Sequence, residues 1–286
     1  MKKILIATDF SANATHAAEY GYNLAGQLKA HIVIGNAFMV PAEVPQAGVI
    51  VWPMEDYDII EKETTDELQQ LKTRLEKKDN AGYKPLISLV NEIGSVTDVV
   101  YGLIKHYSID LIVMGTHGNS GLSTLLLGNH CLKMIDAATK PLLLVPAEAK
   151  IAPVKKIAYA TDFKHPQDDL AAIYALIQFA KSLVGAEILL THVYNEKHHS
   201  PQFQKWLDDL LVDLSNKADY PNIYYRIIKN SNPENGLDWL CKHGQIDILA
   251  MQHRPHNFFD TILKGSHTKR MADHISIPLL VFPTKS

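Results

Sequence analysis

The sequence predicts an α/β fold made of two tandem, doubly wound parallel-sheet domains with five strands each. Three observations lead to this prediction. The chain has 286 residues, and at about 150 residues per domain this length corresponds to two domains. Four short apolar segments occur twice in the same order, and segments with helical periodicity lie between them. Such alternation is typical of a parallel sheet that helices cover on both faces.

The internal repeat sets the expected domain boundaries. The recurring segments are residues 4–10 and 157–163, 30–38 and 186–194, 109–114 and 246–251, and 141–146 and 278–283. The first segment of the second copy lies 153 residues after its counterpart, but the last two segments lie only 137 residues after theirs in the first copy. The second copy is therefore shorter in its middle. We therefore expect one domain at residues 1–147 and another at 154–286, joined by a short polar stretch.

The stretches between the strands of the first copy follow helical patterns. Ser11 precedes apolar residues at helical spacing and is a suitable N-cap. Residues 55–78 carry acidic residues early and basic residues late, as the helix dipole favours. Further helices are expected at residues 96–106 and 128–138, with a strand at 86–90.

Composition excludes several classes of protein. The formal net charge is -3 and no basic run occurs, so the chain is not expected to bind nucleic acid. The apolar start stops at Thr8, too short for a signal peptide, and no stretch is long enough to span a bilayer. We therefore expect a cytoplasmic protein without a membrane contact. Its two cysteines, Cys131 and Cys241, match neither a metal site nor a disulfide framework.

A ligand site is expected at one edge of the first sheet, because ligands of open α/β sheets bind beyond the carboxyl ends of the strands. Residues 8–10, 36–38 and 114–121 leave three strands there, and Gly128 and Asn129 begin a helix. Glycine lets the backbone approach a phosphate closely, and a helix N-terminus favours an anion. From the residues alone, the glycines indicate either an anion-binding loop or an ordinary turn-rich loop.

The glycine spacing resembles that of a known family. Two residues separate Gly115 from Gly118, and nine separate Gly118 from Gly128. This spacing is similar to the nucleotide-binding signature of the ATP-binding universal stress proteins, in which Ser or Thr follows the last glycine. Both copies also resemble the family in strand order and in the Thr-Asp-Phe sequence after the first strand, so the resemblance covers essentially the whole chain. It implies a Rossmann-like fold of the adenine-nucleotide alpha hydrolase type and ATP, with or without Mg, as the ligand.

Matching positions then imply a nucleotide-binding set. Asp9 would face the nucleoside, the backbone of Ala37 would contact adenine, and the glycines would line the ribose and phosphates. The implied set is Asp9, Ala37, Met114, Gly115, Gly118, Gly128 and Asn129. Asn129 departs from the family's Ser or Thr, although an amide can still donate a hydrogen bond. Asp9 could instead be a helix-capping or turn carboxylate, since Asp162 recurs where no ligand is expected.

The second copy lacks the same glycine pattern. Gln252 and Pro255 replace its first two glycines, while Gly265 and Ser266 remain. Proline removes an N–H group and fixes φ, and both replacements place side-chain bulk where the backbone would approach phosphate. We therefore expect no ATP in this copy.

The sequence lacks the parts of a conventional ATPase or kinase. No Gly-x4-Gly-Lys-Ser/Thr loop occurs, and no Lys lies between Gly115 and Gly128. We therefore expect a stress-response regulatory protein that binds ATP in its N-terminal domain with little or no turnover, rather than an enzyme. Two alternatives stay open: a slow ATPase or autophosphorylating protein, and a nucleotide-free protein-interaction module.

Three further features have open interpretations. Residues 39–53 form a long apolar connection, which is either a lid or partner contact or a segment packed on its own domain. The histidines at 198, 199, 253 and 256 raise a metal hypothesis that no ligand spacing supports. Leu142–Val145 and Leu279–Phe282 are expected to pair within one chain, as the last strands of family dimers do. The result would be an intramolecular pseudo-dimer, which could pair again as a homodimer.

Overall fold

The computed structural model describes residues 3–39, 54–78, 82–116, 129–163, 166–194, 201–253 and 276–283. The N-terminal half contains β1 (Lys3–Thr8), α1 (Ala12–Leu28), β2 (His31–Phe38), α2 (Met54–Glu76), β3 (Ile87–Ile93), α3 (Val96–Tyr107), β4 (Leu111–Gly115), α4 (Asn129–Ala137) and β5 (Leu142–Val145). The C-terminal half contains β6 (Lys156–Ala160), α5 (Pro166–Lys181), β7 (Glu187–Tyr194), α6 (Pro201–Ala218), β8 (Ile223–Lys229), α7 (Pro233–His243), β9 (Ile248–Gln252) and β10 (Leu279–Phe282).

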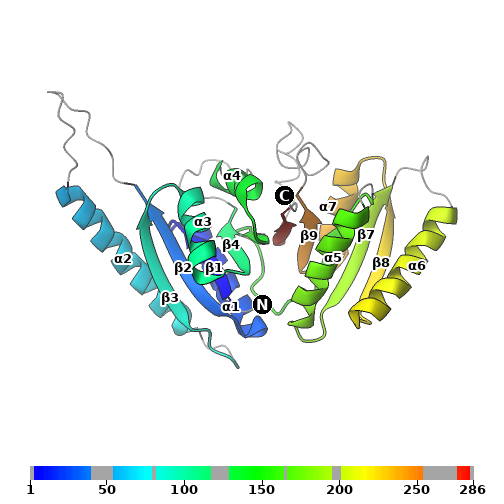
Figure 1. The fold of residues 1–286 in the computed structure, drawn as a ribbon, viewed down its shortest axis with the longest axis horizontal. Helices are drawn as coiled ribbons and strands as arrows, with labels where there is room; N and C mark the ends of the chain where they lie inside the picture. Colours follow the sequence, from blue (N-terminus) through cyan, green and yellow to red (C-terminus); the bar gives the residue numbers. More distant parts are fainter. Residues whose placement is uncertain are drawn as a thin grey trace.

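The strands of both halves form one sheet. This sheet has ten strands in the order β3-β2-β1-β4-β5-β10-β9-β6-β7-β8. In Figure 1 the two halves lie side by side. Pairs within each half are parallel, whereas β5 and β10 are antiparallel, with Leu143 opposite Leu280 and Leu144 opposite Leu279. The structure thus confirms the predicted α/β class with five strands in each half. It also confirms the expected pairing of the last strands, which hides two apolar edges.

Helices cover both faces of the sheet, because successive strand side chains point to opposite faces. Ile4 and Ile6 belong to one apolar layer, which also contains residues of α1, α2, α5 and α6. Leu5 belongs to the other layer, with residues of α3, α4 and α7. Each layer contains residues of both halves, so the core continues across the β5–β10 junction.

Side-chain caps begin two of the helices, α1 and α3. Ser11 caps α1 as predicted, since its Oγ accepts a hydrogen bond from the Ala14 N–H at 3.2 Å. Ser95 caps α3 in the same way. The expected strand at 86–90 is longer in the structure, because its pairing with β2 continues to the Phe38–Ile93 pair.

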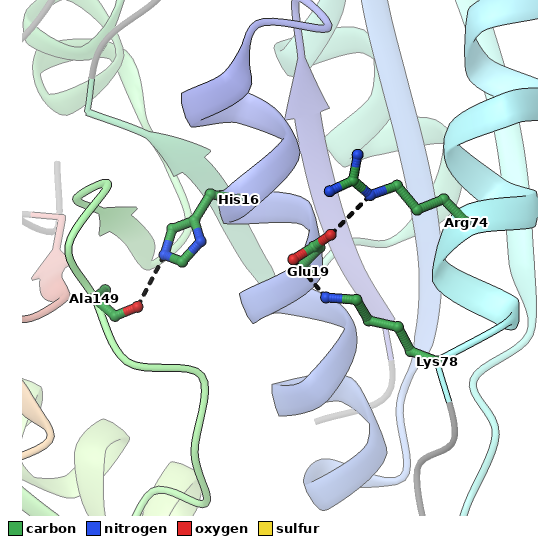
Figure 2. Close-up of polar contacts among 5 residues, drawn as sticks. All are labelled: His16, Glu19, Arg74, Lys78 and Ala149. Carbon is green, nitrogen blue, oxygen red and sulfur yellow. Dashed lines mark hydrogen bonds and ion pairs between the residues drawn. The ribbon is translucent and has the colours of Figure 1, made fainter.

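The connection between the halves packs along α1. His16 Nε2 lies 2.9 Å from the Ala149 carbonyl oxygen, as Figure 2 shows. Farther along the helix, the Val154 N–H donates to Gln27 Oε1 at 2.9 Å. Ala149 and Val154 are both buried. Ala149 and Val154 therefore anchor the joining segment to the core, while residues 147, 148 and 150–153 are exposed.

Both cysteines lie in the core, and burial raises the pKa of the Cys241 thiol to about 12. At neutral pH this thiol stays protonated and is a poor nucleophile. Among the helices that the structure describes, none has the length and apolar composition to cross a membrane.

Candidate functional site

The carboxyl ends of β1, β2 and β4 meet at one place on the sheet edge. β1 lies between β2 and β4, and the chain first builds the sheet outward through β2 and β3 before adding β4 and β5 on the other side. This change of direction is the switch point at which open α/β sheets bind ligands. The structure therefore brings together Asp9, Ala37 and Gly115, which follow or end these three strands.

A tight turn leads from β1 into α1. Phe10 has φ of 61° and its N–H donates to Thr8 Oγ1 at 3.0 Å. Asp9 is exposed, and its Oδ1 accepts a hydrogen bond from the Ser11 N–H at 3.1 Å. Asp9 therefore has the turn-stabilising role that the sequence left open as an alternative to ligand binding.

The C-terminal half has the same turn. Phe163 has φ of 54° and its N–H donates to Thr161 Oγ1 at 3.0 Å. The recurrence of Thr-Asp-Phe thus has a conformational cause that needs no ligand. Asp162 is half-buried, whereas Asp9 is exposed.

The backbone of Ala37 lies near the carboxyl end of β2, at the sheet edge described above. The Phe38 carbonyl accepts from the Gly94 N–H on the β3 side, and backbone groups of successive strand residues face opposite neighbours. The groups of Ala37 therefore face the β1 side. Pairing of β1 with β2 ends at Thr8 and Asn36, so the Ala37 carbonyl lies past the last pair.

Asn36 lies in the 36–38 stretch that the sequence placed at this edge, but the predicted nucleotide-binding set did not include it. It is 4% exposed, and its Nδ2 donates to the Thr8 carbonyl at 2.8 Å, which holds the ends of β1 and β2 together. Within the described residues its buried Oδ1 accepts no hydrogen bond. In the C-terminal half, His192 Nδ1 lies 3.0 Å from the Thr161 carbonyl at the matching position. A polar residue recurring in an otherwise apolar strand was the available signal.

Gly115 is needed for packing, independently of any ligand. A Cβ atom at Gly115 would lie 2.9 Å from the Asn13 carbonyl oxygen and 3.2 Å from the Ala14 nitrogen. The first turn of α1 thus packs directly on the end of β4. Met114 is 7% exposed and belongs to the apolar layer under α3 and α4, so only its backbone lies at the site.

The start of α4 is tied to the end of β4. Cys131 Sγ donates to the Gly115 carbonyl at 3.1 Å, and α4 begins at the predicted residue Asn129. Gly118 and Gly128 lie outside the described residues, as do residues 40–53 of the long apolar connection. Of the predicted set, the structure therefore describes Asp9, Ala37, Met114 and Gly115, together with the helix that begins at Asn129.

Aromatic side chains gather at the corresponding edge of the C-terminal half. The ring of Phe163 lies 5.2 Å from that of Trp206 in an edge-to-face contact, and 5.8 Å from that of His192. Gln252 is half-buried at the position that matches Gly115, while Pro255, Gly265 and Ser266 lie outside the described residues. Rings also meet in the N-terminal half, where Phe38 lies 5.8 Å from Tyr57, so the two edges differ chiefly in Gly115 against Gln252.

The histidine hypothesis concerns mostly undescribed residues, because His198, His199 and His256 fall outside the described ranges. His253 is described, and its Nε2 lies 3.1 Å from Asp136 Oδ1 on α4. Inside the described ranges, no group of three or more His, Cys, Asp or Glu side chains is arranged to hold a metal ion.

The chemistry of the N-terminal edge fits an adenine nucleotide. An exposed carboxylate suits ribose hydroxyls, a strand-end carbonyl suits an exocyclic amine, and a helix N-terminus suits phosphate. Asp9, Ala37 and α4 respectively supply these three groups, and Asp9 lies in the middle because β1 stands between β2 and β4.

Comparison with known proteins agrees with this architecture. The model of the universal stress protein family matches residues 1–146 and again 153–283. A universal stress protein of Methanocaldococcus jannaschii is 29% identical over 151 residues, which cover 52% of this chain and 84% of that protein. A universal stress protein from Archaeoglobus fulgidus shares the fold with a TM-score of 0.72 at 16% identity, over 98% of both chains. Another from Pseudomonas aeruginosa, described as putative, matches with a TM-score of 0.60 at 12% identity, over 99% of this chain and 94% of its own. The chain therefore belongs to the universal stress protein family and carries two family domains in tandem.

Proposed function

We propose that this protein is a stress-response regulator that binds ATP in its N-terminal half with little or no turnover. One observation carries the proposal: exposed Asp9, the backbone of Ala37 and the Gly115–α4 contact converge at the switch point of the sheet. In this proposal Ala37 contacts adenine and Asp9 contacts the ribose. Gly115 and Gly118 line the ribose and phosphates, and Gly128 and Asn129 hold phosphate at the start of α4.

The proposed lack of turnover rests on the sequence of the loop. Phosphoryl transfer needs a positioned cation and a group that orients the attacking water or substrate. The segment from Gly115 to Gly128 contains no Lys or Arg and no acidic residue, and its one titratable side chain is His117. Such a loop can hold a nucleotide through backbone groups without supplying the parts that hydrolysis needs.

The C-terminal half is proposed to bind no nucleotide. Gln252 fills the position of Gly115 and Pro255 that of Gly118, which supports this part of the proposal. The repeat nevertheless offers a matched control for every substitution in the N-terminal site.

Isothermal titration with ATP, with and without Mg, tests the proposal. We expect one nucleotide per chain. Asp9→Asn keeps an amide oxygen for the Ser11 N–H but removes the charge, so ATP affinity should fall about tenfold. Asp162→Asn is the matched change in the other half and should leave affinity unchanged. No binding to the wild-type chain, two nucleotides per chain, or equal effects of the two variants would overturn the proposal.

A phosphate-release assay addresses turnover separately. Gly118→Val places a branched side chain in the loop and should abolish nucleotide binding. If the wild type released phosphate from ATP steadily and Gly118→Val did not, the site would be a slow ATPase instead.

A further inference from the structure

A side chain of the C-terminal half contacts the helix that borders the proposed nucleotide site. His253 follows the end of β9, and its Nε2 lies 3.1 Å from Asp136 Oδ1 on α4. The His253 side chain is 7% exposed, against 49% for that of Asp136. The His253 N–H also donates to the Phe282 carbonyl on β10 at 2.8 Å. The histidine is therefore fixed in its own half and contacts the other half through its ring.

The contacted helix is short enough to transmit a displacement. α4 contains 9 residues, so it is about 13 Å long at 1.5 Å per residue. Its first turn is held by the bond from Cys131 Sγ to the Gly115 carbonyl, and its last turn by the Asp136–His253 pair. Fixing both ends fixes the direction in which the start of α4 points. That start is where the proposed function places the phosphates.

His253 occupies the position in the second copy that corresponds to Thr116 in the first. The 137-residue offset matches it to Thr116, the first residue after Gly115 in the N-terminal loop. Both residues donate their backbone N–H to the last strand of their half, Thr116 to Val145 and His253 to Phe282. The C-terminal loop has lost the first glycine of the motif and presents a buried imidazole to α4 of the other half instead.

We propose that His253 is a positioning residue for the nucleotide site of the N-terminal half, acting through Asp136 and α4. The inference rests on the proposed function, since it concerns the affinity of that site for the phosphates. The C-terminal half then regulates binding in the N-terminal half without binding nucleotide itself. Of the contacts with the nucleotide, only those with the phosphates should depend on His253. Asp9 and Ala37 lie on other elements and contact the nucleoside in the proposed site.

Two ligands separate this role from a general structural one. ATP reaches α4, whereas adenosine lacks the phosphates that meet it. His253→Leu and Asp136→Ala should each weaken ATP binding about fivefold, a typical coupling between sites, and leave adenosine binding, measured by competition against ATP, unchanged. His253→Gln keeps an N–H donor at similar reach and should restore ATP affinity. The double variant should lose no more than either single variant.

His243→Leu is the matched control, since the His243 ring is exposed and bonds to the Trp239 carbonyl of its own helix. It should bind both ligands like the wild type. Unchanged ATP affinity in His253→Leu and Asp136→Ala, or an equal loss of ATP and adenosine affinity, would refute the inference alone. A wild-type chain that binds neither ligand would overturn the proposed function, and this inference with it. Asp136→Ala changes a half-exposed residue, so it keeps the test valid if His253→Leu does not fold.

Discussion

Replacing Glu19 by Gln should destabilise the N-terminal half through the helix that begins at the proposed site. Glu19 lies on α1, and its side chain is 9% exposed. Its Oε1 lies 2.8 Å from Arg74 Nε and its Oε2 lies 2.5 Å from Lys78 Nζ. Figure 2 shows these two cations reaching Glu19 from one side of α1, while His16 contacts the connecting segment on the other.

The size of the effect follows from these contacts. Hydrogen bonds to charged groups contribute about 1.5 to 3 kcal/mol each. Arg74 and Lys78 are 61% and 42% exposed, so solvent screening reduces both. Gln keeps an acceptor but no charge, and we expect a loss of about 2 kcal/mol in the free energy of unfolding. Tm should fall by about 5 °C, since 1 kcal/mol corresponds to about 2–4 °C in chains approaching this length.

The pH dependence of this loss has a definite sign. Burial raises the pKa of Glu19, but the hydrogen bonds from Lys78 and Arg74 outweigh it and the net pKa lies below the ordinary value of 4.5. A carboxyl whose pKa is lower in the folded state stabilises fully above its unfolded pKa, and this stabilisation is lost as pH falls through the folded pKa. The difference between wild type and Glu19→Gln should therefore be largest at neutral pH and shrink below pH 4.5.

Urea unfolding followed by circular dichroism, at a series of pH values, measures both effects. Asp213→Asn on α6 is the control. The side chains of Asp213 and Lys217 are 63% and 64% exposed, so removing this ion pair should leave the urea midpoint unchanged. The reasoning would be refuted if Glu19→Gln had the same urea midpoint as the wild type at neutral pH. It would also be refuted if the difference in stability between the two proteins stayed constant into the acid range.

Three further substitutions test the fold and the site. Gly115→Ala should lose about 1 to 3 kcal/mol of unfolding free energy, because its Cβ would meet the Asn13 carbonyl at 2.9 Å; a wild-type urea midpoint would contradict this. Leu143→Ala removes a fully buried side chain opposite Leu280 and should cost about 3 kcal/mol in the same assay, whereas a change below about 1 kcal/mol would mean that the β5–β10 junction is loosely packed. Asn129→Ser introduces the residue that is usual in the family and should bind ATP at least as tightly in titration calorimetry; weaker binding would show that the amide contributes.

The candidate site was only partly predictable from the sequence. The strand exits at Asp9 and Ala37 follow from where apolar runs end, which is local information. The packing of Gly115 against the start of α1 and the bond from Asn36 to Thr8 join residues that are far apart along the chain. Such contacts depend on how close the elements approach, which residue types and spacing do not record.

The sequence by itself determined the two α/β halves, the positions of their strands and the Ser11 cap, because apolar periodicity and capping act within a few residues. The family resemblance predicted that the last strands pair, but only the tertiary structure decided how the halves fit together. The antiparallel register of β5 and β10, the packing of the connection along α1 and the contact from His253 to Asp136 bring together groups more than a hundred residues apart. Their energies depend on shape and burial across the assembled core, so no local pattern could have specified them.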